Sequence, residues 1–230
     1  MDSKYISKYI LIIFIIIFII FLICILYRNY FILPRLKDKF LILHKNLKTI
    51  LPDLLKILKK NNIKNFITAG TLLGYKRNKK IIPWDDDIDI AIIDEDNIKQ
   101  KFENIKNELK NENKYYISEC SFGYKFNLKD DENVFIDLFI YKQNGDKFLL
   151  TDEAIKLWPD EFYNVKDLFP LKEDVFEGIM VNIPNNCIPY LISTFGKNYN
   201  SPKLTHIHHT EINKFDKFIV RFLRHITIPK

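Results

Sequence analysis

The sequence has little cysteine, and what it has forms no familiar motif. Its three cysteines, Cys24, Cys120 and Cys187, include no Cys-x-x-Cys pair, which argues against a zinc–thiolate site. Cys24 lies in an apolar N-terminal run, so at most one disulfide can form in the rest of the chain. Cysteine usage therefore indicates neither a disulfide scaffold nor a cellular compartment.

The sequence also lacks long runs of one charge sign and any Asn-x-Ser/Thr sequon. The formal net charge is +6 and the isoelectric point is about 9.0, with the positive residues spread along the chain. This pattern favours anionic partners, such as a nucleotide, a phosphorylated sugar or a membrane surface. It argues against a dedicated nucleic-acid binder, and no nucleic-acid partner is expected.

The N-terminal apolar run predicts a membrane anchor. Ile10–Leu26 is uninterrupted except for Cys24, and tyrosines flank it on both sides. At ~1.5 Å per residue the run covers roughly 26 Å, near the lower limit for crossing a bilayer core. It is long for a cleaved signal peptide, and no small-x-small site follows it. We therefore predict a short tail at residues 1–9 and a retained single-pass anchor at residues 10–27.

Residues 28–60 are predicted to form a stalk and an amphipathic helix. Leucines and isoleucines recur there at close to helical spacing, and Pro52 is expected to kink the helix or to start a second one. Basic residues on both sides of the apolar run, with a small excess after it, favour a cytoplasmic C-terminal domain on charge alone.

A strand and a small-residue turn open the remaining domain, which we place at residues 61–205. Phe66–Ala69 reads as the strand, Gly70-Thr71 as the turn, and Leu72–Tyr75 as a short helix. Backbone amides at such a helix start can bind phosphate, although a purely structural turn has the same pattern. A basic loop is expected at Lys76–Lys80, where the fork-shaped side chain of Arg77 is the best phosphate ligand.

Four aspartates in five positions follow. If a strand begins at Asp85, the side chains of Asp85, Asp87 and Asp89 share one face at a spacing of ~6.6 Å. Two charges at that distance repel by roughly 2.5 kcal/mol at an effective dielectric constant near 20. A hard divalent cation, Mg²⁺ or Mn²⁺, removes this conflict. An exposed acidic turn is the alternative, but such turns seldom run directly into a sequence as apolar as Ile-Ala-Ile-Ile.

Asp137 is the only charge in the apolar run Val134–Tyr141, which predicts a buried strand. A buried carboxylate costs several kcal/mol unless it is paired or bound to metal. An ion pair would satisfy it, and so would a metal shared with Asp87 and Asp89. The acidic cluster upstream favours the metal, in a site able to orient a nucleophile.

Other segments of the chain have weaker signals. The expected elements are a helix at Asp94–Asn113, strands at Tyr115–Glu119, Tyr124–Leu128, Lys147–Thr151 and Val175–Ile183, a helix at Cys187–Thr194, and an amphipathic segment at Lys214–His225 that is either a last helix or a membrane-surface segment. Residues 153–169 read as irregular, and residues 206–230 as a tail or helix. His206, His208 and His209 lie close in sequence, but no further metal ligands are identifiable, so a loop is expected.

At this point the motifs resemble a known family. Ala69–Gly74, Arg77, Ile82–Ile90 (IPWDDDIDI) and Ile136–Phe139 (IDLF) are similar to the signature of the LicD/fukutin-related transferases. Weaker pieces between residues 168 and 196 resemble that family's C-terminal block. Together these motifs cover roughly residues 60–205 in the expected order.

The resemblance implies an α+β fold of the nucleotidyltransferase type, a small mixed sheet flanked by helices. It places Gly70 and Thr71 near nucleotide phosphates. It makes Asp87 and Asp89 the metal-binding pair and Asp137 the third carboxylate, all three catalytic, with Asp85 as an outer partner or an extra ligand to Mg²⁺ or Mn²⁺.

The reaction implied by the resemblance is transfer of a phospho-alcohol, such as phosphocholine or ribitol phosphate, from a CDP-activated donor to a glycan hydroxyl. The anchor would then place the catalytic domain in the ER or Golgi lumen or outside the cytoplasm, against the charge count. Phe195-Gly196 replaces the family's usual Tyr-Gly and the domain is short, which implies a reduced acceptor site. A nucleotidyltransferase acting on a small molecule, RNA or protein, and an inactive membrane-tethered binding protein, are the alternatives.

Overall fold

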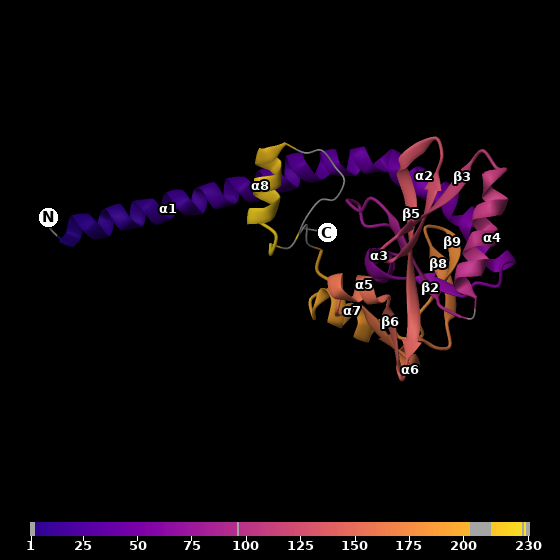
Figure 1. Ribbon diagram of the computed structural model, residues 1–230. Coiled ribbons are helices and arrows are strands. Elements are labelled where there is room, and N and C mark those ends of the chain that lie inside the picture. Colours follow the sequence, from indigo (N-terminus) through magenta and orange to yellow (C-terminus); the bar gives the residue numbers. More distant parts are fainter. Residues whose placement is uncertain (1–2, 96, 203–212, 227, 229–230) are drawn as a thin grey trace. The chain divides into compact units, whose positions relative to one another are not determined.

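A computed structural model describes residues 3–95, 97–202, 213–226 and 228 (Figure 1). The chain divides into two compact units, which are described separately. One contains Met1–Lys39 and Ser201–Lys230, and the other contains Phe40–Asn200.

The unit of residues 40–200 is built on a mixed seven-stranded sheet. Its central order is β1-β2-β5-β4-β3, with β6 paired to β5 and β7 paired to β6. These strands are β1 (Asn65–Ile67), β2 (Ile88–Ile93), β3 (Tyr115–Cys120), β4 (Gly123–Leu128), β5 (Asp131–Asn144), β6 (Lys147–Leu150) and β7 (Phe162–Asn164). β2 and β5 are parallel, and every other pair in this sheet is antiparallel. All six residues of β2 are buried, as expected for an apolar strand in the middle of a sheet.

Helices flank the sheet, and together they make the expected α+β architecture (Figure 1). They are α2 (Leu33–Lys60), which begins in the other unit, α3 (Ala69–Asn78), α4 (Ile98–Lys110), α5 (Asp152–Leu157), α6 (Val165–Leu168) and α7 (Ile188–Phe195). α4 buries an apolar stripe of Ile98, Phe102, Ile105 and Leu109. α2 continues through Pro52, so no second helix begins there.

Near the acidic cluster, the prediction of a basic loop was wrong about where the helix ends, and the condition set for the acidic strand is not met. The basic stretch Lys76–Lys80 is not a loop at its start, because α3 continues to Asn78 and ends where Lys79 adopts a left-handed conformation, φ 56°. β2 begins only at Ile88, so Asp85 and Asp87 lie in the loop before the strand rather than on it.

The C-terminal part of this unit also differs from expectation. The single strand expected at residues 175–183 is a hairpin of β8 (Lys172–Phe176) and β9 (Ile179–Ile183). Its turn, Glu177-Gly178, has positive φ at both positions, which suits a two-residue hairpin loop. The region expected to be irregular contains α5, β7 and α6, and α4 begins at Ile98 rather than at Asp94.

The other unit contains α1 (Ser3–Tyr27), the π-helical segment η1 (Arg28–Ile32), the start of α2, and α8 (Lys214–Phe222). Within the described residues, one helix is long and apolar enough to cross a membrane, with a mean hydropathy of 3.7 over its most apolar window. The segment expected to be a last helix or a membrane-surface segment is helical at Lys214–Phe222. His206, His208 and His209 lie outside the described residues.

A substitution at Gly74 tests how closely α3 packs against Lys80 and Ile82, in the segment that leads to the acidic cluster. A β-carbon there would lie 2.5 Å from the Lys80 carbonyl oxygen. Glycine to alanine inside a helix normally stabilises by about 1 kcal/mol. We expect Gly74→Ala to reverse that sign, because overpacking costs about 1–3 kcal/mol. The thermal midpoint of the full chain in detergent should fall by about 2 °C or more.

The matched control for this prediction is Lys76→Ala, at an exposed position of the same helix, which should leave the midpoint nearly unchanged. A Gly74→Ala midpoint at or above that of the natural chain would show that α3 does not pack as described.

Candidate active site

The parallel pairing of β2 and β5 brings the three predicted catalytic carboxylates together. Asp89 on β2 is the direct partner of Asp137 on β5, so both side chains project from the same face of the sheet. Asp87 lies just before β2. One carboxylate oxygen from each of Asp87, Asp89 and Asp137 lies within 4.8 Å of the others. Asp89 and Asp137 are 6% and 7% exposed, respectively.

The electrostatic cost of this arrangement is large. Two unit charges 4.8 Å apart repel by about 3–4 kcal/mol at an effective dielectric constant of 20. Burial raises the pKa of Asp87 well above its usual value, and the charges of Asp89 and Asp137 raise it further. Burial likewise raises the pKa of Asp89, with added contributions from Asp85 and Asp137. The site therefore requires protons or a cation to balance its charge.

Asp85 and Asp86 extend the acidic centre. Carboxylate oxygens of Asp85, Asp86 and Asp87 form a second group within 4.8 Å, so Asp87 belongs to both groups. The Asp86 side chain belongs only to this second group. It lies outside the group of Asp87, Asp89 and Asp137, yet it is buried, and its Oδ2 has no hydrogen-bond partner among the described residues. Nε2 of His44 on α2 lies 2.6 Å from the carbonyl oxygen of Asp85 and holds this loop.

The donor set fits a hard divalent cation. It consists only of carboxylate oxygens, which is the chemistry that Mg²⁺ and Mn²⁺ prefer. The buried and unpaired Oδ2 of Asp86 is a further sign that the protein alone does not satisfy this region. Of the ligand residues predicted from the sequence, Asp87, Asp89 and Asp137 lie together in one group, while Asp85 lies in the adjoining group that shares Asp87.

Gly70 and Thr71, expected to form a turn before the helix, lie instead in the first turn of α3, directly against the carboxylates. The Thr71 backbone amide donates to Oδ2 of Asp89 over 3.1 Å. The Thr71 hydroxyl accepts from the Asp89 amide at 2.7 Å and donates to Oδ2 of Asp89 at 3.3 Å. A β-carbon on Gly70 would lie 2.9 Å from Oδ2 of Asp85 and 3.3 Å from Oδ2 of Asp89, so the turn approaches closely because it has a glycine here. Thr71 therefore orients Asp89, while the Gly70 amide takes part in none of these bonds.

A buried network of hydroxyl groups binds Thr68 and Ala69, the residues just before Gly70. Thr68 bonds the hydroxyl of Tyr163 at 2.8 Å and donates to that of Tyr190 at 3.4 Å. Tyr190 also accepts from the amide of Ala69, whose φ of 43° is unusual for a residue with a side chain. The rings of Tyr163 and Tyr190 stack with centroids 4.1 Å apart. These contacts hold the start of α3 in its strained conformation.

Glu161 ends this network. It accepts from the Tyr190 hydroxyl at 3.2 Å. Burial raises the pKa of Glu161 to about 7, although the hydrogen bonds from Tyr190 and Tyr141 act in the opposite direction. A titratable carboxyl is therefore linked through one hydroxyl to the turn that holds Asp89.

Two basic side chains reach the same region. Lys125 on β4 lies across from Asp137, and its Nζ is 2.6 Å from Oδ1 of that carboxylate. Arg77, in the last turn of α3, donates from Nε to the carbonyl oxygen of Tyr199 over 2.9 Å. Burial lowers the Arg77 pKa and the charge of Asp85 opposes that shift. The ion pair, one of the two alternatives predicted for Asp137, is thus present, and the shared metal stays a prediction.

Lys125, Tyr190 and Glu161 were not predicted from the sequence as site residues. Lys125 lies on a predicted strand next to a predicted buried strand, so an inward-facing lysine was a usable signal. Tyr190 gave no such signal, because it is 122 residues from Thr68 in sequence and meets it only in the folded chain. Glu161 gave none either, because it is linked to Thr68 through the Tyr190 hydroxyl.

These features define a nucleotidyltransferase-type α+β domain with an acidic centre. The family model described as "LicD/FKTN/FKRP, nucleotidyltransferase domain" matches residues 62–186, more than half of the chain. The chain therefore belongs to the LicD/FKTN/FKRP family.

Curated relatives agree with this assignment. An uncharacterized protein of Rickettsia prowazekii (strain Madrid E) is 34% identical over 149 residues, covering 62% of this chain and 51% of the relative. Human ribitol-5-phosphate transferase FKTN is 27% identical over 164 residues, covering 70% and 34%. Mouse ribitol 5-phosphate transferase FKRP is 30% identical over 149 residues, covering 61% and 29%. The chain spans about half or less of the length of these relatives.

Among solved structures, the crystal structure of ANT(2″)-Ia in complex with adenylyl-2″-tobramycin is similar at 16% identity and a TM-score of 0.39. The similarity covers 59% of this chain and 67% of that chain.

Thr71→Val tests the hydrogen bonds between the Thr71 hydroxyl and Asp89. Valine keeps the shape of threonine but removes the hydroxyl, which leaves the buried Asp89 amide without its acceptor. An unsatisfied buried group costs about 1–3 kcal/mol, so we expect the thermal midpoint to fall by several degrees. Thr71→Ser, which retains the hydroxyl, should recover most of this loss. Equal midpoints for the valine and serine variants would rule out the hydroxyl as the stabilising group.

Glu161→Gln tests the buried carboxyl. Because its folded pKa is raised to about 7 from an ordinary 4.5, the folded state binds more protons than the unfolded state between these values. The free energy of unfolding therefore falls by up to about 3 kcal/mol as pH rises through this window. Between pH 5 and pH 8, thermal midpoints of Glu161→Gln should decline less than those of the natural chain.

The control for this comparison is Glu153→Gln, at an exposed position on α5, which should decline in parallel with the natural chain. If Glu161→Gln also declined in parallel, the carboxyl would not titrate in that window.

Proposed function

We propose that this chain is a metal-dependent phosphotransferase that moves a phospho-alcohol from a CDP-activated donor to a glycan hydroxyl. The observation that carries the proposal is the group of Asp87 and the buried Asp89 and Asp137 against Gly70 and Thr71 in the first turn of α3. Family membership and relatives named as ribitol-5-phosphate transferases support this class of reaction. Ribitol phosphate and phosphocholine are the two candidate groups.

Asp87, Asp89 and Asp137 would hold Mg²⁺ or Mn²⁺, with Asp85 as a further ligand. When bound, the ion would neutralise the donor diphosphate and stabilise the charge that develops on the leaving CMP. The Thr71 hydroxyl and amide keep the Asp89 carboxylate aimed at this position. Lys125 offsets part of the negative charge by pairing with Asp137.

The phosphate side of the donor would lie near Gly70 and Arg77. The Gly70 amide stands at the positive end of α3, and the lack of a side chain lets an anion approach the backbone. Arg77 in the last turn of the same helix would exchange the Tyr199 carbonyl for a phosphate oxygen.

In the transfer step, a glycan hydroxyl attacks the phosphorus next to the alcohol. The new oxygen–phosphorus bond forms as the bond to CMP breaks, and CMP leaves as a phosphate monoester. Asp137 orients the hydroxyl and accepts its proton. Most of the rate enhancement then comes from positioning and fixed charge.

α1 would serve as a single-pass membrane anchor, since it is long and apolar enough to cross a bilayer. We place the catalytic unit on the luminal or extracytoplasmic side, as the family resemblance implies. Protection of residues 40–200 from protease added outside sealed microsomes would support this orientation.

The test of the reaction is CMP release by the full chain in detergent, with CDP-ribitol, CDP-choline or CDP-glycerol and a glycan acceptor, followed by mass spectrometry. We expect turnover with at least one donor only when Mg²⁺ or Mn²⁺ is present. Asp89→Asn keeps the shape of the side chain but removes its charge, and should reduce the rate more than about 100-fold. Asp130→Asn, at an exposed position, is the matched control and should be near normal.

Two results would reject the proposal. Near-normal transfer by Asp89→Asn would show that the acidic centre is not the active site. AMP transfer from ATP, with no CMP release from any CDP-alcohol, would identify the chain as a nucleotidyltransferase instead.

A further inference from the structure

α8 has three distinct faces. One is buried against the N-terminal helices and contains Asp216, Ile219 and Val220. The second is a row of exposed aromatic side chains, Phe215, Phe218 and Phe222, which are 59%, 60% and 53% exposed. The third is an exposed basic row of Lys214, Lys217 and Arg221. Exposed rings in a row require an explanation, because α8 already has a separate apolar face for docking.

Arg28 fixes the C-terminal end of α8. This residue follows the apolar run of α1 directly and is fully buried. Its guanidinium donates to the carbonyl oxygens of Leu223 and Ile226, at 3.2 and 2.9 Å. A helix leaves its last carbonyls unpaired at the negative end of its dipole, so a cation suits that end. Leu223, the C-cap of α8, and Ile226 beyond it thus supply acceptors for a charge next to a highly apolar segment.

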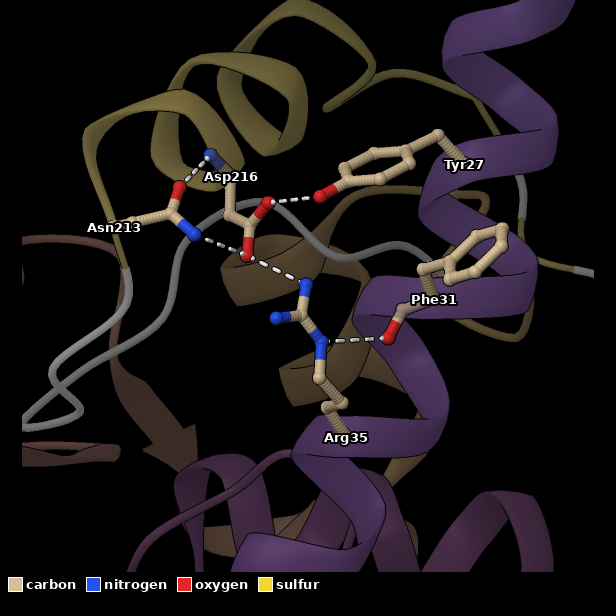
Figure 2. A network of polar contacts seen from close by, with 5 residues as sticks. All are labelled: Tyr27, Phe31, Arg35, Asn213 and Asp216. Carbon is tan, nitrogen blue, oxygen red and sulfur yellow. Dashed lines mark hydrogen bonds and ion pairs between the residues drawn. The ribbon is translucent and has the colours of Figure 1, made fainter.

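Asp216 fixes the N-terminal end (Figure 2). It accepts from the Arg35 guanidinium at 2.9 Å and from the Tyr27 hydroxyl at 3.1 Å. Asn213 caps α8 by accepting from the Asp216 amide at 2.8 Å, and its own amide group donates to the Asp216 carboxylate at 3.1 Å. Both ends of α8 are therefore bound where the apolar run of α1 ends.

The aromatic row continues onto the side of α1. The ring of Phe222 meets that of Phe21 edge-on at 6.1 Å, and Phe218 stacks on Phe222 at 6.0 Å. A groove of about 380 Å³ lies between the two helices and is lined by Phe14, Ile17, Phe18, Ile20, Phe21 and Phe222. The exposed face of α8 thus extends the apolar surface of α1 without interruption.

We propose that α8 is an interfacial helix, with Phe215, Phe218 and Phe222 inserted into lipid beside α1 and with a lipid acyl chain in the groove. The inference rests on the proposed anchor role of α1. Lipid fits better than a second protein because the groove is formed largely by α1 residues that a bilayer would surround. The basic row also complements anionic lipid phosphates, and aromatic rings favour the bilayer interface.

The test is site-directed spin labelling of the full chain in vesicles of phosphatidylcholine and phosphatidylglycerol at a 3:1 ratio. All three cysteines are replaced by alanine or serine, and single labels are placed through Phe218→Cys, Lys217→Cys and Ile16→Cys. Collision with oxygen reports lipid, and collision with a nickel chelate reports water. We expect the label at 218 to be several-fold more accessible to oxygen than to the nickel chelate, with the neighbouring label at 217 showing the opposite preference.

The label at 16 separates this inference from the anchor on which it rests. If position 16 is in lipid while 218 is as wet as 217, α1 is an anchor but α8 is not interfacial. If position 16 is in water, the anchor itself is wrong, and the inference falls with it. Spin–spin broadening at 218 would show that a second copy covers the row, which would also overturn the inference.

A second variant avoids changing the cysteines. Phe218→Trp adds a third tryptophan to Trp84 and Trp158. Lipids brominated high on the acyl chain should quench its fluorescence clearly more than they quench that of the natural chain. Equal fractional quenching in the two proteins would contradict insertion of the aromatic row.

Discussion

Three carboxylates in one place, two of them buried, are the constraint on which the catalytic unit depends. The register of β2 on β5 brings Asp89 and Asp137 side by side, and Asp87 completes the group. Their repulsion opposes folding, so the surroundings act against it. Lys125 pairs with Asp137, and Thr71 binds both the backbone and the side chain of Asp89. The charge that remains is what a divalent cation would balance.

The unit of residues 1–39 and 201–230 also buries a charged group, in this case a positive one. Arg28 is buried next to a long apolar helix, where an unpaired charge would be costly. The carbonyl oxygens at the end of α8 satisfy it, and Asp216 joins Tyr27 and Arg35 at the other end of the same helix. In both units, a charged group that would be unfavourable alone determines which segments pack together.

Much of the fold was predictable because it depends on local pattern. The stripe of α4, the buried run of β5 and the apolar length of α1 each follow from the periodicity or composition of a single segment. The hairpin turn at Glu177-Gly178, where both residues have positive φ, was missed because the apolar residues on either side of it read as one continuous strand. The end of α3 was misplaced because basic residues suit a helix C-terminus as well as a loop.

In the candidate site, some residues could be predicted from the sequence and others depend on the tertiary structure. The sequence by itself determined the carboxylates of Asp87, Asp89 and Asp137 and the Gly70-Thr71 turn, because residue type and short spacing carry their chemistry. Only the tertiary structure decided that Lys125 faces Asp137 and that Tyr190 and Glu161 support the turn. Those contacts depend on strand register and on helix placement over many residues, and no short stretch of sequence specifies either one.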